Sequence, residues 1–225
     1  MGNIRNGRVM MSKLTRISMA VIRRLPKYHR YLGELIEKDI DRISSKELSE
    51  KIGFTASQIR QDFNCFGDFG QQGYGYNVRE LYDDINKILG LNRTYNTIIV
   101  GAGNLGQAVA NYTSFEKRGF NLKGIFDKNP KLFGITIRDI EIKDVDDLEK
   151  FLKAENIDIG ILCLPKSQAQ GIADVFVKCN IDAIWNFAPT DLDVPEEVIV
   201  ENVHLSESLF TLSYRLNETE FFNNK

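Results

Sequence analysis

The sequence predicts an α/β protein in which an N-terminal winged helix-turn-helix domain precedes a Rossmann-type domain with a doubly wound parallel sheet. Three observations predict this fold. Two short helical segments, each opened by a capping residue, flank a glycine turn within residues 44–66, as in a helix-turn-helix. The motif Gly-x-Gly-x-x-Gly follows a β-rich run at residues 96–106. Strand and helix patterns then alternate to about residue 187, which is typical of a parallel sheet.

The charge of the chain is unevenly distributed. Its 225 residues are enough for two domains. Residues 1–75 hold 13 of the 29 Lys and Arg residues but only 8 of the 31 Asp and Glu residues. A basic first part in front of an acidic remainder indicates that the first part meets an anionic partner.

A cytoplasmic protein without a bound metal is expected. Every apolar run falls short of the roughly 20 residues that a membrane helix needs. Residues 1–13 are polar and basic, which predicts a flexible tail rather than a signal peptide. Cys65, Cys163 and Cys179 are odd in number and have neither metal-ligand nor disulfide spacing.

The winged-helix domain is expected over residues 14–77. Apolar residues recur at helical spacing between Ser18 and Asp39. Pro26 resets this helix, because its ring is tolerated only in the first turn. We therefore expect a short basic segment followed by a helix that starts near Pro26.

Two capping boxes predict the helix-turn-helix. Ser44 with Glu47 opens the first helix and Thr55 with Gln58 opens the second, while Gly53 suits a left-handed helix end. Early residues of the second helix, expected over residues 56–66, meet base edges in the major groove in this motif. Ile59 and Phe63 are expected to face the core, and the candidate DNA-reading residues are Ser57, Gln58, Arg60 and Gln61.

The segment FGDFGQQGYGYNV, residues 66–78, predicts a hairpin, because glycine serves the turn and tyrosine the strands. A hairpin after a recognition helix is a wing, and its tip, Gln71-Gln72, would touch the minor groove or the backbone. Each of these pieces also occurs in proteins that do not bind DNA. Their order, together with the basic excess, favours DNA binding. Asn77 and Glu80 then predict a connecting helix over residues 78–92 that ends near Gly90.

A dinucleotide-binding domain is expected over residues 93–202. Gly101 permits the tight turn, Gly103 lets the backbone approach a pyrophosphate, and Gly106 allows close helix–strand packing. The next predicted strand, residues 122–126, ends at Asp127, which lies 21 residues after Gly106. An acid at this distance binds the ribose hydroxyl and would repel a 2′-phosphate, so NAD is expected rather than NADP.

The following segments predict a helix over 144–154, a strand over 157–164, a helix over 166–179 and a strand over 181–187. Ligands bind beyond the carboxyl ends of such strands. The strand ends Cys163-Leu164-Pro165 and Asn186–Pro189 could therefore face either end of the dinucleotide, or could be plain loops. A last helix, residues 205–222, carries a stripe formed by Leu205, Leu209, Leu212 and Leu216 and docks on its own domain or on another subunit.

Catalytic apparatus is not recognisable. An NAD-dependent enzyme needs a general acid or base, and the two histidines, His29 and His204, stand outside any His-Asp, Lys-Tyr or metal pattern. A cysteine at a strand end, such as Cys163, is more often a small apolar filler than a nucleophile. A sensor of the cofactor is favoured. The alternatives are an NAD-dependent oxidoreductase with an accessory N-terminal domain and a nucleotide-binding scaffold with a protein-docking winged helix.

Taken together, the motifs resemble the Rex family of redox-sensing transcriptional repressors. The resemblance extends from about Leu14 to Leu216. It is carried by RLPKYHRYL, SSKELSEKIG, QIRQDFNCFGDFGQQGYGYNV, VGAGNLGQA, the Phe126-Asp127 pair, LCLP, NFAP and VENVHLSESL. It implies a non-enzymatic homodimer whose C-terminal helix, residues 203–225, is swapped between subunits. It further implies a double-stranded operator with an inverted repeat, from which NADH releases the protein while NAD+ competes without releasing it.

The resemblance also implies residue roles. Asp127 is matched to the adenosine ribose, Tyr112 and Asn186–Pro189 to the nicotinamide, and Arg30 to a domain-linking switch that also involves Tyr112 and His204. Together with the glycine turn and the strand ends described above, the complete candidate set for the cofactor is Gly101, Ala102, Gly103, Asn104, Leu105, Gly106, Tyr112, Asp127, Lys128, Cys163, Leu164, Pro165, Asn186, Phe187, Ala188 and Pro189. Together with the recognition helix and the wing, the candidate set for DNA is Arg24, Arg30, Ser44, Lys46, Ser57, Gln58, Arg60, Gln61, Gln72 and Tyr74, of which the resemblance places Arg24, Arg30, Ser44 and Lys46 near phosphates.

Two positions depart from the family pattern. The wing tip, usually basic, is Gln71-Gln72, which should lower the salt dependence of DNA binding. The tail often carries Asp where this chain has His204, so the pairing of a carboxylate with Arg30 is lost. His204 could instead hydrogen-bond Tyr112, and its protonation would repel Arg30. The NADH response is therefore expected to depend on pH between about 6 and 8, unless His204 is merely packed.

Overall fold

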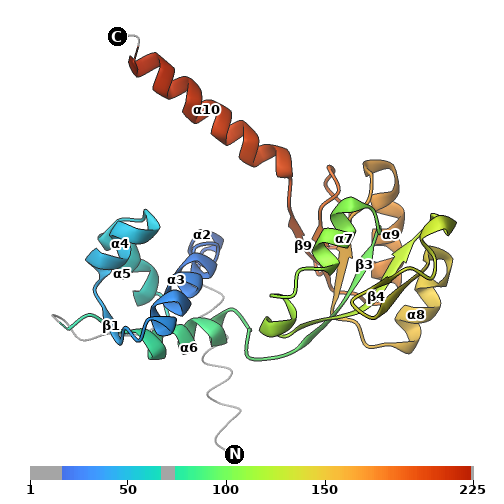
Figure 1. Ribbon diagram of the computed structural model, residues 1–225, viewed down its shortest axis with the longest axis horizontal. Helices are drawn as coiled ribbons and strands as arrows, with labels where there is room; N and C mark the ends of the chain where they lie inside the picture. Colours follow the sequence, from blue (N-terminus) through green and yellow to red (C-terminus); the bar gives the residue numbers. More distant parts are fainter. Residues whose placement is uncertain (1–16, 67–73, 224–225) are drawn as a thin grey trace, which may run out of the picture. The chain divides into compact units, whose positions relative to one another are not determined.

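The computed structural model describes residues 17–66 and 74–223 and divides the chain into two compact units, Met1–Asn92 and Arg93–Lys225 (Figure 1). The tail over residues 1–13 and the wing tip Gln71-Gln72 lie outside the described residues. The elements of the first unit are α2 (Met19–Ile22), α3 (Leu25–Glu37), β1 (Arg42–Ile43), α4 (Ser45–Ile52), α5 (Ala56–Asn64), β2 (Tyr76–Asn77) and α6 (Val78–Ile88).

The predicted start of α3 and the predicted helix-turn-helix are both present. Pro26 lies in the first turn of α3. Ser44 and Glu47 form the expected reciprocal capping box at α4, and Gly53 ends that helix with φ +73°. The second box is one-sided: Thr55 accepts a hydrogen bond of 3.1 Å from the backbone N–H of Gln58, but the reciprocal bond that defines a capping box is not formed.

Strand β2 pairs antiparallel with β1, so Tyr76 lies opposite Ile43. The hairpin that the sequence predicts over residues 66–78 lies largely outside the described residues and stays a prediction. Its described end, β2, is held against the strand that precedes α4, and Tyr76 is buried and packs edge-on against Phe63 at 5.0 Å.

The helix α6 belongs to the core of the first unit. Its apolar residues Val78, Leu81 and Ile85 are buried in one cluster with Leu25 and Leu32 of α3. Asn77 caps the helix by accepting hydrogen bonds from the N–H groups of Arg79 and Glu80. This helix therefore packs against α3 in the core of the first unit, and it also leads to the second unit.

The second unit contains a seven-stranded sheet with strand order β5-β6-β4-β3-β7-β8-β9, parallel except for β5. Its strands are β3 (Tyr95–Val100), β4 (Phe120–Asp127), β5 (Thr136–Ile137), β6 (Ile140–Asp144), β7 (Ile159–Leu162), β8 (Ala183–Asn186) and β9 (Ile199–Asn202). Its α-helices are α7 (Asn104–Ala110), α8 (Leu148–Ala154), α9 (Lys166–Lys178) and α10 (Leu205–Asn223). Neighbouring residues of β3, Ile98 and Ile99, belong to two different core clusters, as alternation in a doubly covered sheet requires.

Three strands of this sheet were not predicted. The strands β5, β6 and β9 are short. Strand β6 ends at Asp144, the residue at which the sequence predicted a helix to begin. The helix α8 begins at Leu148, after a single turn of 3₁₀ helix over Val145–Asp147. In the centre of the sheet, Val100 at the end of β3 pairs with Phe126 of β4 on one side and with Leu162 of β7 on the other. The carboxyl ends of these three strands therefore lie side by side.

The helix α10 presents large apolar side chains to solvent. Leu205, Leu209, Leu212 and Leu216 of the predicted stripe are each more than half exposed, as are Phe210 and Tyr214. None of the described helices combines the length and the apolar character needed to cross a membrane.

Candidate dinucleotide cleft and DNA-reading helix

The glycine turn between β3 and α7 leaves no room for side chains at two of its three glycines. Gly101 has φ +103°, and a Cβ placed there would collide with the carbonyl oxygen of Cys163. A Cβ on Gly106 would collide with the carbonyl oxygen of Gly101. A Cβ on Gly103 would meet no atom within 4 Å. Gly101 and Gly106 thus serve the packing of the turn, while Gly103 leaves open space where a ligand can approach the backbone.

The turn delivers backbone donors to this space. Gly103 is the N-cap of α7 and Asn104 is its first residue, and both are exposed. The first N–H groups of a helix have no partner within the helix, and together with the helix dipole they favour phosphate. Leu105 is half-buried and Ala102 is fully buried.

The carboxylate of Asp127 is fixed by two backbone donors. One oxygen accepts a hydrogen bond of 2.6 Å from the N–H of Ala102, and the other accepts one of 2.8 Å from the N–H of Asn129. Each oxygen retains a lone pair, so the carboxylate can still accept a hydrogen bond from a hydroxyl group. The acid is half-buried at the end of β4, beside the glycine turn.

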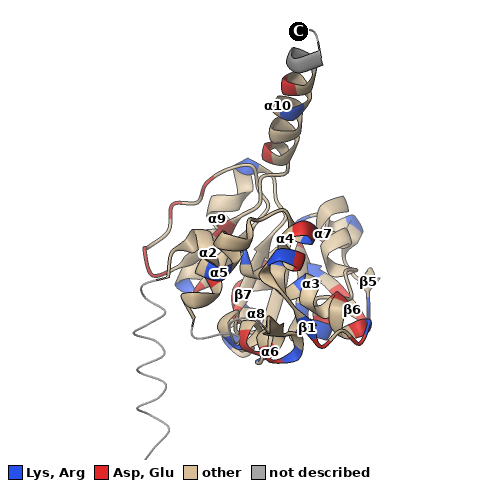
Figure 2. Cartoon of the chain, turned by 90° about the vertical axis from the view of Figure 1, so that its left-hand side faces the viewer, with Lys and Arg blue, Asp and Glu red and all other residues tan. Residues whose placement is uncertain are grey.

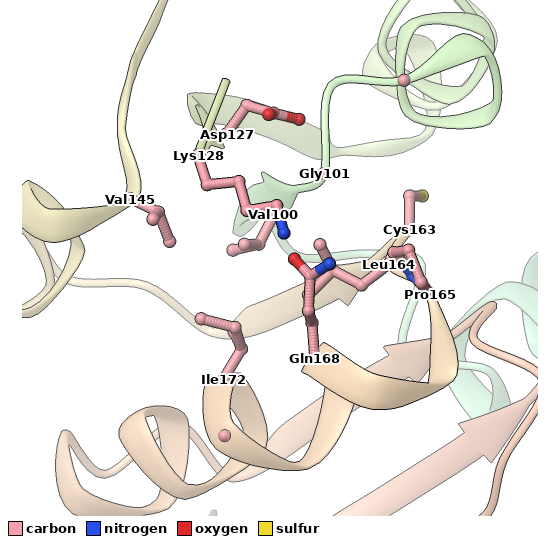
Figure 3. A pocket seen from close by; sticks show the side chains of 12 residues that line it. Val100, Gly101, Asp127, Lys128, Val145, Cys163, Leu164, Pro165, Gln168 and Ile172 are labelled. Carbon is pink, nitrogen blue, oxygen red and sulfur yellow. The ribbon is translucent and has the colours of Figure 1, made fainter. Parts of the chain in front are cut away.

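A cleft of about 420 Å³ opens at this edge of the sheet. Figure 3 shows the amino group of Lys128 and the amide of Gln168 pointing into it from opposite sides, with Val145 and Ile172 on one wall. Of the residues expected at the cofactor, the cleft brings together Gly101, Gly103, Asp127, Lys128, Cys163, Leu164 and Pro165. The lining residues that the sequence analysis missed are Val100, Val145, Gln168, Gly171 and Ile172.

Two signals could have found the missed residues. Val145 directly follows β6, a strand that the sequence analysis did not predict, so recognising that strand would have placed Val145 at the same edge. Gln168, Gly171 and Ile172 lie in the first two turns of α9, which starts after the strand end at Pro165. Residues spaced three and four apart on such a helix share one face.

The thiol of Cys163 lies in the cleft and is protected. Burial raises the pKa of this thiol to about 12. A thiol with this pKa is not a nucleophile at neutral pH. The geometry therefore agrees with the interpretation of Cys163 as a filler between the glycine turn and α9.

The segment Asn186–Pro189 lies at the end of β8, beyond the residues that line the cleft. The buried amide of Asn186 donates hydrogen bonds of 2.7 Å to the carbonyl of Thr190 and 2.8 Å to Asn202, and its oxygen accepts one of 3.0 Å from the N–H of Ala188. The ring of Phe187 packs on Trp185 at 4.5 Å. Asn186 thus anchors the loop that Phe187, Ala188 and Pro189 form.

Tyr112 and His204 occupy separate surroundings in the chain. The ring of Tyr112 is 55 % exposed and packs against Phe115 at 4.6 Å. His204 Nε2 lies 3.8 Å from an Asp191 carboxylate oxygen. Among the described residues of a single chain, no hydrogen bond joins His204 to Tyr112, so that expected pairing is not formed within the chain.

The recognition helix α5 has one buried and one exposed face. Ile59 and Phe63 are buried as predicted, whereas Ser57, Arg60 and Gln61 are exposed and Gln58 is half-buried. Arg60 donates a hydrogen bond of 3.0 Å to the hydroxyl of Ser45 on α4. The exposed face thus offers an arginine and a glutamine, the side chains that read guanine and adenine in the major groove.

Further basic and polar groups lie on α3, on α4 and beside β2. Lys27 and Arg30 on α3, and Lys46 and Lys51 on α4, are exposed. Figure 2 shows the Lys and Arg residues of the chain in blue. Ser44 uses its hydroxyl to cap α4. Tyr74, beside the undescribed wing tip, is 70 % exposed, and its carbonyl accepts a hydrogen bond from Arg42.

Arg24 does not point to solvent as a phosphate ligand would. Its guanidinium forms two hydrogen bonds, of 2.7 and 2.6 Å, with the carboxylate of Asp62 on α5. The side chain of Arg24 is 19 % exposed and that of Asp62 is 3 % exposed. The pairing with a buried acid draws this charge toward the domain, and the expected contact of Arg24 with DNA phosphates stays a prediction.

Metal-binding geometry is not found in the described part of the chain, where no three His, Cys, Asp or Glu side chains are grouped closely enough to hold an ion.

Comparison with known proteins gives consistent relationships over both units. The family model of the CoA binding domain matches residues 92–190, and that of a putative DNA-binding protein N-terminus matches residues 16–64. The chain is 70 % identical over 212 residues to the redox-sensing transcriptional repressor Rex of Thermoanaerobacter pseudethanolicus, covering 94 % of this chain and 95 % of the relative. It is 68 % identical over 210 residues to the repressor of the same name from Clostridium perfringens strain SM101, covering 93 % and 99 %.

Solved structures agree with these relatives. The crystal structure of RSP in complex with β-NAD+ and operator DNA is 70 % identical, covers 92 % of this chain and 96 % of its own, and superposes with a TM-score of 0.85. The structure of RSP in complex with β-NADH is 66 % identical, with coverages of 93 % and 98 % and a TM-score of 0.86.

Proposed function

Because this chain belongs to the Rex family of redox-sensing transcriptional repressors, we propose that it represses genes by binding an operator and leaves the operator when NADH occupies its second unit. The observation that carries the proposal is the coexistence, in one chain, of an exposed arginine and glutamine on a helix-turn-helix and an open glycine turn beside an acid-ended strand. The family consists of repressors, so the alternative of an oxidoreductase with an accessory domain is set aside.

NADH and NAD+ are proposed to occupy the cleft of the second unit. The pyrophosphate lies against the backbone of Gly101, Ala102, Gly103, Asn104, Leu105 and Gly106, and the adenosine ribose against Asp127 and Lys128. Cys163, Leu164 and Pro165 form the opposite wall. Tyr112 and the loop of Asn186, Phe187, Ala188 and Pro189 border the nicotinamide. The open space at Gly103 and the two backbone bonds of Asp127 support this assignment.

Operator DNA is proposed to bind the exposed face of α5. Ser57, Gln58, Arg60 and Gln61 read base edges, Arg30, Ser44 and Lys46 contact phosphates, and Gln72 and Tyr74 belong to the wing. A homodimer matches an inverted repeat, because two symmetric subunits present two recognition helices to two half-sites. Such a protein works in the cytoplasm, where the genome and the NADH pool are found.

The homodimer is proposed to form through α10, swapped between subunits. The apolar side chains that the described part of α10 exposes, Leu205, Leu209, Phe210, Leu212, Tyr214 and Leu216, would then be covered by the partner, since exposed apolar patches of this kind mark interfaces. We further propose that Arg30, Tyr112 and His204 transmit the change of cofactor to the DNA-binding unit.

The proposal is tested by fluorescence anisotropy of a labelled operator duplex, that of the 70 % identical RSP, titrated with this protein at fixed salt. NADH and NAD+ are then added separately. Release by NADH at far lower concentration than any effect of NAD+ is expected, because a ligand shifts an equilibrium only through differential affinity. By linkage, the operator must weaken NADH binding by the same factor. Tight operator binding that neither cofactor changes would exclude a redox switch.

A further inference from the structure

The recognition helix carries one buried carboxylate that is tied to the helix preceding the helix-turn-helix. Asp62 lies directly after Gln61, and its side chain is 3 % exposed. One oxygen accepts hydrogen bonds from Arg24 Nε at 2.7 Å and from the hydroxyl of Tyr28 at 2.6 Å. The other oxygen accepts one from Arg24 Nη2 at 2.6 Å. A single side chain of α5 is thus held by three donors from the start of α3.

The donors keep the charges and protons that this arrangement needs. Burial raises the pKa of Tyr28 above its ordinary value, with a further contribution from its hydrogen bond to Asp62, so its hydroxyl stays protonated and donates. The hydrogen bonds to Asp62 raise the pKa of Arg24, which stays charged. Both donors therefore keep the protons that their hydrogen bonds to Asp62 need.

The aromatic contacts of α5 with the core are less directional. Phe63 packs edge-on against Tyr28 and against Tyr76, each at 5.0 Å. Aromatic and aliphatic packing tolerates small rotations of a helix about its axis. A bidentate arginine–carboxylate pair does not, because two parallel hydrogen bonds fix both distance and orientation.

Rotation of α5 decides which residues face DNA. Each residue advances about 100° around a helix, so the orientation of Asp62 toward the core determines the directions of Arg60 and Gln61. A buried ion pair is a poor means of gaining stability, because desolvation offsets its attraction, and apolar replacements are often as stable. The presence of this pair on the recognition helix therefore agrees better with a role in orientation.

We propose that Arg24, Asp62 and Tyr28 form a positioning clamp that sets the rotation of α5 and thereby the base preference of the repressor. The proposal rests on the proposed function, because it concerns how that DNA-reading face is held. Arg24 acts here through Asp62 and not by contact with phosphate.

The test compares the unaltered protein with the double variant Arg24→Met/Asp62→Leu, which removes both charges at similar volume and leaves the net charge unchanged. Affinities are measured over a range of salt concentrations for the RSP operator duplex and for a scrambled duplex of equal length and composition. Thermal unfolding is recorded in parallel. We expect a folded variant whose operator affinity falls at least tenfold, while its affinity for the scrambled duplex changes less than threefold and the salt slope is unchanged.

The controls separate positioning from other roles. Glu149→Leu/Lys153→Met removes an ion pair of 2.6 Å in the second unit and should leave the operator preference unaltered. If Arg24 were a phosphate ligand, both duplexes would lose affinity equally and the salt slope would fall by about 1; that result overturns the proposal. An unchanged preference for the operator in the double variant also overturns it.

If the double variant does not fold, Asp62→Asn, which preserves the shape of the side chain but weakens the pairing, serves instead. It should reduce the ratio of operator to scrambled affinity severalfold in a folded protein, and an unchanged ratio overturns the clamp. The unaltered protein tests the proposed function separately, since failure to prefer the operator duplex at all would exclude that function, whatever the variants do.

Discussion

Asp127 accepts a hydrogen bond of 2.6 Å from the backbone N–H of Ala102, which joins the end of β4 to the glycine turn at the end of β3. Its second oxygen holds the N–H of Asn129, so the same carboxylate also shapes the loop that follows β4. The residue assigned to the ribose therefore supports the turn assigned to the pyrophosphate. The two recognition elements for one dinucleotide form a connected structure.

Replacement of Asp127 by Ala should lower the affinity for NADH at least tenfold, because both the ribose contact and the support of the turn are lost. Isothermal titration with NADH measures the effect. The matched control is Asp158→Ala, which removes a carboxylate that accepts a hydrogen bond of 2.7 Å from the N–H of Asn96 near the start of β3. That variant should bind NADH within about twofold of the unaltered protein, and equal losses in both variants would contradict the assignment of Asp127.

Gly101 and Gly103 should respond differently to replacement by Ala. Gly103→Ala adds a methyl group to open space and should alter stability by no more than about 1 kcal/mol, yet it should weaken NADH binding by obstructing the pyrophosphate. Gly101→Ala forces a side chain onto φ +103° and should cost about 1–3 kcal/mol from backbone strain alone. Urea unfolding and NADH titration of both variants separate the two effects. Unimpaired NADH binding by Gly103→Ala would show that the pyrophosphate does not lie there.

Arg60→Ala and Lys46→Ala should weaken DNA binding in different ways, the first through base preference and the second through phosphate attraction. Loss of a bidentate base contact at Arg60 should cost about 1–3 kcal/mol on the operator and relax the preference at one base pair of each half-site. Loss of a phosphate contact at Lys46 should weaken operator and scrambled duplexes alike and reduce the salt slope by about 1. Anisotropy with single-base operator variants and a salt series measures both effects. An unchanged base preference in Arg60→Ala would show that Arg60 does not read a base.

Cys163 should resist alkylation where Cys65 does not. Burial raises the pKa of the Cys163 thiol to about 12, so it holds its proton at pH 8, whereas Cys65 is exposed at the end of α5. Peptide mapping after iodoacetamide treatment should show modification of Cys65 first, and modification of Cys163 that accelerates as the pH rises toward 12. The unfolded thiol ionises near pH 8.5, so this group makes folding less favourable as pH rises above that value. Equal alkylation of the two residues at pH 8 would contradict the burial of Cys163.

The position of His204 beside Asp191 gives the NADH response an expected pH dependence. A charged ring at His204 would be attracted to Asp191, 3.8 Å away, and would repel Arg30 if the two meet in the dimer. The NADH concentration that releases half of the operator should therefore differ between pH 6 and pH 8. His204→Gln, which preserves hydrogen bonding without the charge, should remove the difference. An identical response of the unaltered protein at both pH values would show that His204 is only packed.

Local chemistry allowed the helix-turn-helix and the glycine turn to be predicted. The capping box of Ser44 and Glu47, the left-handed Gly53 and the spacing of Gly101, Gly103 and Gly106 each depend on residues within a few positions of one another. Interactions of this range leave a direct trace in the sequence. The strands β5, β6 and β9 left none, because each buries at most one residue and so lacks the buried apolar residues that mark β7 and β8.

The sequence by itself determined the helix-turn-helix, the glycine turn and the acid that ends the second strand of the second unit. Only the tertiary structure decided how side chains distant in the sequence are used. Arg24 looks like a free basic residue until folding places Asp62, 38 positions later, against it. Val145, Gln168 and Ile172 became walls of the cleft because strand order brings separate chain segments to one edge. Local patterns encode backbone conformation, whereas the partner of a charge or the wall of a cleft depends on packing across the whole unit.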